Sequence, residues 1–257
     1  MKKAIAFLLT LLLAAGTVLI VHTPPIAAHG DDEWKTDAVP LGRPAKDPIR
    51  GRLSGLTIGL DPGHQKKANN GKEPVAPGSS VKKKKVSSGT QGRFTRVPEY
   101  VVNLQAALKL KTLLENEGAR VVMTRTTHDV NISNAERAQL FNREGVDLAI
   151  RLHCNGTKKT GVYGAFILIP SQTVHAAACM HAARCILDAY IKATGTKNRG
   201  ITKRSDQSGF NWCTRPIINI EMGYMTNKAE DRKLASSGYQ NKMAKGLFNG
   251  ICLYFGR

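Results

Sequence analysis

Residues 56–64 read Leu-Thr-Ile-Gly-Leu-Asp-Pro-Gly-His, and this stretch sets the pattern for the rest of the chain. Its apolar part, residues 56–60, has the length of one buried β-strand. Asp61-Pro62-Gly63 is a turn sequence, because proline and glycine both favour turns over extended structure. His64 follows the turn directly. The stretch therefore predicts a strand that brings a polar, titratable side chain to its carboxyl end.

Helices and further strands alternate after this first strand. Residues 99–117 repeat apolar side chains at helical spacing and stop at Gly118. Ser133-Asn134-Ala135-Glu136 is a capping box that opens a second helix, to about residue 144. Further strands are expected at 119–124, 147–153, 164–169 and 216–221, and further helices at 173–194 and 239–255. This alternation predicts an α/β fold, a single domain with a mostly parallel, twisted sheet covered by helices on both faces.

The segment between the first strand and the first helix is unusual in charge. Residues 65–98 contain nine Lys or Arg and one acidic residue, with repeated Gly, Ser and Pro. Four of the lysines are consecutive, at positions 82–85. Because apolar periodicity is lacking, we expect a long basic loop.

The first 28 residues have the features of an export signal. Lys2 and Lys3 precede uncharged residues 4–21, and Ile26-Ala27-Ala28 offers small residues to a peptidase. The uncharged stretch is also long enough for a membrane anchor. We therefore expect residues 1–28 to be a signal peptide or membrane anchor, and the proline-containing residues 29–51 to be a linker. The catalytic domain is expected over 52–257, exported to the cell wall or extracellular space, and attached to the membrane only if the first segment is not cleaved.

Composition excludes several classes of protein. The 257 residues include 38 Lys plus Arg against 19 Asp plus Glu, a formal net charge of +19, and 42% of them are apolar. Such an apolar fraction supports a packed core and excludes wholesale disorder. Five cysteines are an odd number and too few for a disulfide scaffold, so we expect most to be free, with Cys154 and Cys252 buried. The charge predicts anionic surroundings, and export argues against nucleic acid as the partner.

Four polar residues are placed where they can meet. Binding sites in open parallel sheets form outside the carboxyl ends of the strands. His64 follows the first strand, whereas His153 and Glu221 each close a later strand. Glu99 opens the helix that returns from the first strand. Two imidazoles and one carboxylate are the ligand set of a hydrolytic zinc centre, and a further carboxylate can act as general base. The pattern leaves open which glutamate takes which role.

Each of the four residues also has a purely structural interpretation. A lone histidine is more often hydrogen-bonded than a metal ligand, and Glu99 could simply favour the helix N-terminus. Glu221 is harder to dismiss, because a carboxylate that closes an apolar strand would be partly buried. We expect it to have a positive partner.

Two other groups of residues are set aside as sites. One is a row on the helix predicted at 173–194, made of His175, Cys179, His181 and Cys185. At about 100° per residue this row splits into two pairs on different faces, which one metal ion cannot contact together. The other is Cys154, a possible thiol nucleophile. Because adjacent strand residues point to opposite faces, Cys154 cannot face the site if His153 does.

The motifs around these positions carry a resemblance to a known family. In chain order they are Ile58-Gly59-Leu60-Asp61-Pro62-Gly63-His64, Pro98-Glu99-Tyr100, Thr124-Arg125, Ser133-Asn134-Ala135-Glu136-Arg137, Arg151-Leu152-His153-Cys154-Asn155 and Ile220-Glu221-Met222-Gly223-Tyr224-Met225-Thr226-Asn227. From about residue 56 to residue 255 the chain resembles the zinc-dependent N-acetylmuramoyl-L-alanine amidases of the Amidase_3 family.

The resemblance implies a reaction and assigns roles to the four residues. His64, Glu99 and His153 correspond to the ligands of a Zn²⁺ cofactor, and Glu221 to the catalytic glutamate. The implied reaction is hydrolysis of the amide between the lactyl group of N-acetylmuramic acid and L-alanine in peptidoglycan. Glu221 would take a proton from water and deliver it to the leaving nitrogen, as base and then acid.

The chain departs from the family pattern at two places. Arg151 stands where many members have a small residue, and residues 65–98 are long and basic. This basic segment either holds anionic wall polymers, gates the site between His64 and Glu99, or is a solvated loop. Asn155, two residues beyond a ligand, either orients the site or forms a turn.

Two other functions remain possible on the same residues. One is a zinc peptidase that cuts within the stem peptide, and the other is a non-catalytic wall-binding or regulatory relative. The second would be expected to lack a ligand or the base, and all four residues are present.

Overall fold

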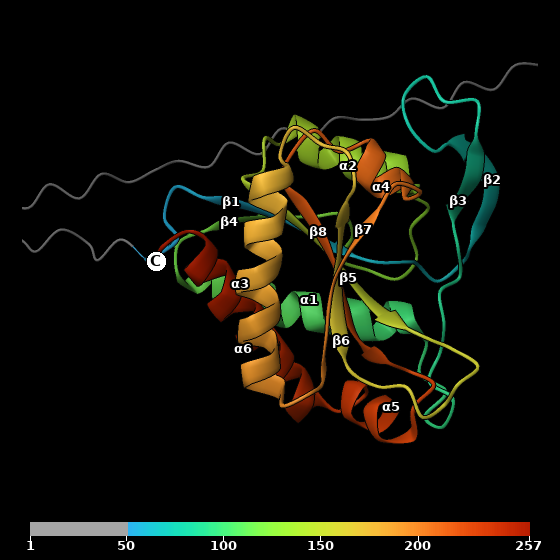
Figure 1. The fold of residues 1–257 in the computed structure, drawn as a ribbon, viewed down its shortest axis with the longest axis vertical. Helices are drawn as coiled ribbons and strands as arrows, with labels where there is room; N and C mark the ends of the chain where they lie inside the picture. Colours follow the sequence, from blue (N-terminus) through green and yellow to red (C-terminus); the bar gives the residue numbers. More distant parts are fainter. Residues whose placement is uncertain (1–50) are drawn as a thin grey trace, which may run out of the picture. The chain divides into compact units, whose positions relative to one another are not determined.

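Six strands of the computed structural model, which describes residues 51–257, form a central sheet in the order β4-β1-β5-β8-β6-β7 (Figure 1). The predicted export signal and nearly all of the predicted linker lie outside the described residues. The strand bounds are β1 Thr57–Pro62, β4 Arg120–Met123, β5 Leu148–Asn155, β8 Ile217–Tyr224, β6 Ala165–Pro170 and β7 Asn198–Arg204.

Most neighbouring strands run parallel, as predicted. β4, β1, β5 and β8 form one parallel block. β6 runs antiparallel to β8, and β7 pairs in parallel with β6, so these two strands are reversed together. β7 was not predicted, because its sequence Asn-Arg-Gly-Ile-Thr-Lys-Arg has no apolar alternation. Such a charged composition is typical of an edge strand, which must not pair with other chains.

Helices cover both faces of the sheet, as predicted. A larger core joins the sheet to α1 (Glu99–Asn116), α3 (Ala176–Thr194) and α6 (Ser237–Tyr254). A smaller core on the opposite face contains Phe141 of α2 (Asn134–Arg143) and Phe210 of α4 (Ser208–Asn211). The short helix α5 (Lys228–Leu234) packs against β8 and α6. The two short helices, α4 and α5, were not predicted.

Strand β5 divides its side chains between these two cores. Leu148, Ile150, Leu152 and Cys154 belong to the larger core. Ala149 belongs to the smaller core, and residues 151 and 153 follow it on that same face because side chains alternate along a strand. Cys154 therefore points away from His153, as predicted.

The predicted long loop is in part a β-hairpin, so this expectation was wrong. β2 (Asn69–Pro74) and β3 (Lys82–Val86) pair antiparallel and form a separate two-stranded sheet (Figure 1). The backbone N–H of Ala135 donates to the buried Glu73 carboxylate, and Trp212 Nε1 donates to the carbonyl of Pro74. The hairpin was missed because its strands are mostly charged, and these long-range bonds leave no local pattern in the sequence.

Two further expectations can be compared with the described residues. All five cysteines are free, and Cys154 and Cys252 are buried as predicted. Within residues 51–257, no helix combines the length and the apolar character that crossing a membrane requires.

Candidate metal centre

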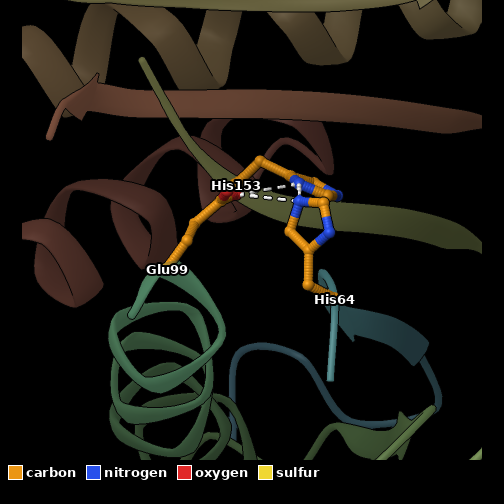
Figure 2. A group of neighbouring side chains, drawn as sticks. All are labelled: His64, Glu99 and His153. Carbon is orange, nitrogen blue, oxygen red and sulfur yellow. Dashed lines mark hydrogen bonds and ion pairs between the residues drawn. The ribbon is translucent and has the colours of Figure 1, made fainter. Parts of the chain in front are cut away.

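Three of the four residues singled out in the sequence meet at one point (Figure 2). His64 comes from the turn after β1, His153 lies near the carboxyl end of β5, and Glu99 is the first residue of α1. β1 and β5 are neighbouring parallel strands, so their carboxyl ends lie side by side. The topology alone therefore brings the two imidazoles together, and α1 begins at the same edge.

The atoms that could bind a metal ion are close to one another. His64 Nε2 and His153 Nδ1 are 3.2 Å apart. Glu99 Oε1 lies 3.2 Å from the first nitrogen and 3.1 Å from the second. Ligands at about 2.0–2.1 Å from a tetrahedral zinc ion are separated by about 3.3 Å. The spacing of these three donors, and their N, N, O chemistry, fit a zinc ion held between them.

Two glycines leave the space that this arrangement requires. A Cβ atom at Gly63 would lie 2.1 Å from the nearest atom of the His153 ring. A Cβ atom at Gly89 would lie 2.7 Å from both Glu99 Oε2 and the His64 ring, and Gly89 has a left-handed φ of +75°. Larger residues at either position would displace the candidate ligands.

Further hydrogen bonds hold the three side chains in place. His64 Nδ1 lies 2.9 Å from the carbonyl of Ser87, just after the hairpin, which orients its other nitrogen toward Glu99. The backbone N–H of Thr90 donates to Glu99 Oε2. Asn103 Nδ2 and the backbone N–H of Cys154 both donate to Glu99 Oε1. The carboxylate is thus fixed from three elements of the fold.

Burial and hydrogen bonding set the charge of these groups. Burial acts to raise the pKa of Glu99, but hydrogen bonds from His153 and His64 outweigh it and hold that pKa well below its ordinary range. Burial lowers the pKa of His153 to about 4, and the Glu99 carboxylate offsets only part of this effect. A negative carboxylate and a neutral imidazole are the forms that bind metal ions.

Glu221 lies beside the three candidate ligands on the neighbouring strand. It pairs with His153 in the register of β5 and β8, and it lines the same cleft. Asn219 Nδ2 donates to its carboxylate at 3.4 Å. No ion pair to Glu221 forms within residues 51–257, and the expected positive partner acts only at longer range, through the charge of Arg151. Burial, together with the negative charge of Glu99, instead raises the pKa of Glu221 to about 8.

A buried ionic cluster lies under the centre. Asp61 receives hydrogen bonds from Arg137 Nη1 at 2.7 Å, Arg151 Nε at 2.9 Å and Thr124 Oγ1 at 2.7 Å. Burial alone would raise the pKa of Asp61, but Arg137 and Arg151 lower it far below its ordinary value. Arg137 also donates to the carbonyl of His64. The cluster therefore fixes the backbone on which a candidate ligand stands.

The cleft above these groups has a volume of about 610 Å³ and is bounded by the hairpin and by the face of the sheet that carries α2 and α4. Its lining includes His64, His153 and Glu221 together with lysines of the hairpin. A cleft that contains the candidate ligands and one further carboxylate is large enough to admit part of a polymer.

Other residues considered in the sequence do not join this site. Among the described residues, His64, Glu99 and His153 form the one group with metal-binding spacing, so the row on α3 does not. Asn155 is the last residue of β5, and its side chain accepts a hydrogen bond from the N–H of Gly156. The contacts of Ser87 and Thr90 could not be predicted, because they are made mainly through backbone atoms. Asn103 could have been, since it lies four residues after Glu99 on one helix.

Comparisons with known proteins point to one family of enzymes. The Amidase_3 profile, described as N-acetylmuramoyl-L-alanine amidase, matches residues 58–252. An N-acetylmuramoyl-L-alanine amidase of Mycobacterium tuberculosis is 26% identical over 210 residues, covering 77% of this chain and 86% of its own length. The germination-specific N-acetylmuramoyl-L-alanine amidase of Bacillus subtilis is 25% identical over 266 residues, covering 99% and 97%. The crystal structure of the amidase Ami1 from Mycobacterium smegmatis superimposes with a TM-score of 0.73 at 23% identity, covering 79% of this chain and 98% of that one, a likeness of fold.

Proposed function

The chain belongs to the Amidase_3 family of N-acetylmuramoyl-L-alanine amidases, and on that premise we propose that it is a zinc-dependent hydrolase of peptidoglycan. The bond that it cleaves is the amide between N-acetylmuramic acid and L-alanine. His64, Glu99 and His153 hold the metal ion, and Glu221 is the catalytic base.

The convergence of three donor atoms from three separate elements carries this proposal. Their separations of 3.1–3.2 Å match a metal centre. In their metal-binding forms the two imidazole nitrogens and the carboxylate oxygen each direct a lone pair at this point. A fourth group, Glu221, lies on the adjacent strand and is not needed as a ligand.

The side chains of this protein divide the chemistry between them. Zinc, when bound here, supplies a Lewis acid that polarises the amide carbonyl and lowers the pKa of water to about 7. Glu221 accepts the proton of the attacking water and delivers it to the leaving alanine nitrogen. Burial and the charge of Glu99 raise the pKa of Glu221 above that of an ordinary carboxyl, toward neutrality, and such a shift suits a group that must both accept and release a proton.

The remaining polar contacts hold the side chains of the base and of the ligands in position. Asn219 holds one oxygen of the Glu221 carboxylate, and the Ser87 carbonyl holds the His64 ring. Glu99, buried and fixed by three N–H donors, has no freedom to take over the role of the base. This difference in restraint separates the two glutamates, which the sequence pattern alone did not.

Product analysis tests the proposal against its rivals. Purified walls are digested with the protein, with and without a chelator, and the muropeptides are identified by mass spectrometry. We expect a free L-alanine amine and an intact lactyl carboxylate, formed only when zinc is present. Cleavage within the stem peptide would instead identify a peptidase, and the absence of any cleavage would indicate a non-catalytic wall-binding relative.

We also propose that the protein acts outside the cell, on the basis of the N-terminal sequence. Fractionation of cells that produce the full chain tests this, because an exported enzyme is found in the wall or medium and an uncleaved one with the membrane. The exposed lysines of the β2–β3 hairpin would add electrostatic attraction to anionic wall polymers.

A further inference from the structure

One row of residues on the cleft face of the sheet has no role in the proposed reaction. His153 and Glu221 are partners in the register of β5 and β8, and Arg151 and Asn219 are partners two residues earlier. All four line the cleft. Side chains two residues apart on a strand share a face and are separated by about 6.6 Å along it. Arg151 and Asn219 thus stand one step away from the reacting groups.

The charge beneath this row is not balanced. Arg125, Arg137 and Arg151 are all buried close to Asp61, whereas Glu99 is held by the two histidines and Glu221 forms no ion pair with an arginine among the described residues. Arg125 donates to backbone carbonyls, and Arg137 donates to Asp61 and to further carbonyl and amide oxygens. Buried charges are normally paired, so this surplus of positive charge favours an additional anion.

Arg151 is the arginine of this group that lines the cleft. Its Nε donates to Asp61 and its Nη2 donates to Asn134, which fixes the guanidinium plane. Nη1 has no hydrogen-bond partner within residues 51–257. Gly209 leaves it room, because a Cβ atom there would lie 2.5 Å from Nη1.

Asn219 offers a second unused group in the same row. Its side chain is 2% exposed, and its Nδ2 donates to Glu221. Its Oδ1 is buried and has no hydrogen-bond partner among the described residues. A buried acceptor without a donor costs free energy, and the N–H of a bound peptide would remove that cost.

The hairpin adds positive charge to the opposite wall of the cleft. Lys72 and Lys84 are cross-strand partners in the register of β2 and β3, and both line the cleft with Lys82. Like charges directly opposite each other destabilise a β-ribbon. None of these three lysines forms an ion pair in the described part of the chain, whereas Lys83 pairs with Asp206.

We propose that Arg151, Asn219, Lys72 and Lys84 form a carboxylate-binding subsite for the second residue of the stem peptide. Two residues of extended peptide span about 6.6 Å, which is the separation between this row and the reacting groups. Guanidinium and amide groups together suit a carboxylate beside a peptide bond. The inference rests on the proposed function and adds a substrate class, namely stem peptides whose second residue has a free carboxylate and not a carboxamide.

The test compares two soluble muramoyl peptides that differ only in this carboxylate. We expect kcat/KM to be about tenfold higher for the free carboxylate than for the carboxamide, because a hydrogen bond to a charged group is worth at least this factor. Arg151→Ala should bring the ratio close to one, and the double variant Lys72→Gln, Lys84→Gln should lower it about threefold. A ratio of one in the unmodified enzyme, or an unchanged ratio in the lysine variant, overturns the proposal.

Two controls keep the outcome specific to the subsite. Lys192→Gln with Lys242→Gln removes the same charge from exposed positions on α3 and α6, outside the cleft, and should leave the ratio unchanged. A ratio that falls equally in this control would mean that net charge, and not the subsite, selects the substrate. Thermal unfolding of Arg151→Ala shows whether that variant is folded. If it is not, the double variant Lys72→Gln, Lys84→Gln decides the question.

Direct binding separates this proposal from the proposed function. Calorimetry with the two cleaved peptides, one with the carboxylate and one with the carboxamide, needs no turnover. Tighter binding of the carboxylate peptide, lost in the lysine variant, supports the subsite even if neither muramoyl peptide is hydrolysed. Equal binding of both peptides overturns the subsite even if the amidase activity is present.

Discussion

Two aspartates of this protein each hold two cationic side chains, one beneath the candidate metal centre and one at the rim of the cleft. Asp61 binds Arg137 and Arg151 and its side chain is fully buried. Asp206 binds Arg204 and Lys83, and 49% of its side chain is exposed. The pKa of each carboxyl is lowered by its partners. The chemistry is alike, so burial is the difference between the two clusters.

This difference separates the floor of the cleft from its wall, the β2–β3 hairpin. At the floor, Arg137 joins the buried Asp61 to the His64 carbonyl. The hairpin is held by the buried Glu73 and by Trp212, and Lys83 adds bonds to Asp206 that are exposed enough for water to replace. Reacting groups must be held within fractions of an ångström, whereas a polymer needs room to enter. Substitutions should therefore have large effects at the floor and small effects at the wall.

The largest effect is expected at the reacting groups above the floor. Glu221→Gln removes the proton acceptor and should lower kcat by a factor of about a thousand or more, while zinc stays bound near stoichiometrically. His153→Ala should lose activity and zinc together, and Glu99→Gln should weaken both, because an amide is a poorer ligand than a carboxylate. Metal analysis of the purified variants checks this, and zinc loss in Glu221→Gln would show that Glu221 is a ligand.

The next largest effect should come from removing the buried carboxylate itself. Asp61→Asn leaves Arg137 and Arg151 without their charged partner, and the loss of one member of a buried ion pair costs about 3–5 kcal/mol. Chemical denaturation of the variant and the parent measures the difference in free energy of unfolding. A change of about 1 kcal/mol or less, as is usual for an exposed ion pair, would mean that burial does not distinguish Asp61 from Asp206.

Acid should reduce the stability that the floor provides. The folded-state pKa of Asp61 lies below its unfolded value, so its contribution is complete above about pH 4 and is lost as the pH falls further toward the folded value. The parent should therefore lose more free energy of unfolding below pH 4 than Asp61→Asn does. Parallel stability curves for the two proteins would contradict this assignment.

A smaller effect is expected at the rim. Asp206→Asn should change the free energy of unfolding by about 1 kcal/mol or less, since exposed ion pairs contribute little. It should nevertheless speed hydrogen exchange of the β2–β3 backbone, because Lys83 loses its partner. Slow, unchanged exchange in β2 and β3 would show that Glu73 and Trp212 hold the hairpin without help.

The smallest effect concerns electrostatic attraction of the protein to the bacterial cell wall. Replacing the four lysines at 82–85 with Gln should weaken binding to intact walls a few-fold at low salt, and the difference should fade above about 0.1 M salt as charges are screened. Co-sedimentation with purified walls measures this. Because residues 82–84 line the cleft, the same substitutions should lower the turnover of soluble substrates that carry a carboxylate. The sequence alone could not choose between these two roles.

Local signals in the sequence were enough to predict most of the fold and the meeting of His64, Glu99 and His153 in the candidate metal centre, with Glu221 beside them. The apolar run before Asp61, the capping box at Ser133 and the periodicity of 99–117 act over a few residues, so they can be identified without the fold. Parallel strands place their carboxyl ends at one edge, which is why His64, His153 and Glu221 could be expected to meet.

Tertiary structure decided what depends on distant partners. The pairing of the charged strands β2 and β3, the reversal of β6 with β7, and the buried bonds from Arg137 and Arg151 to Asp61 join residues far apart in the chain. The sequence determines which side chains follow each strand, because strand ends depend on local composition. Only the folded structure shows that Glu99 is fixed by several donors whereas Glu221 has one long contact, since that depends on burial and on hydrogen bonds formed across the sheet.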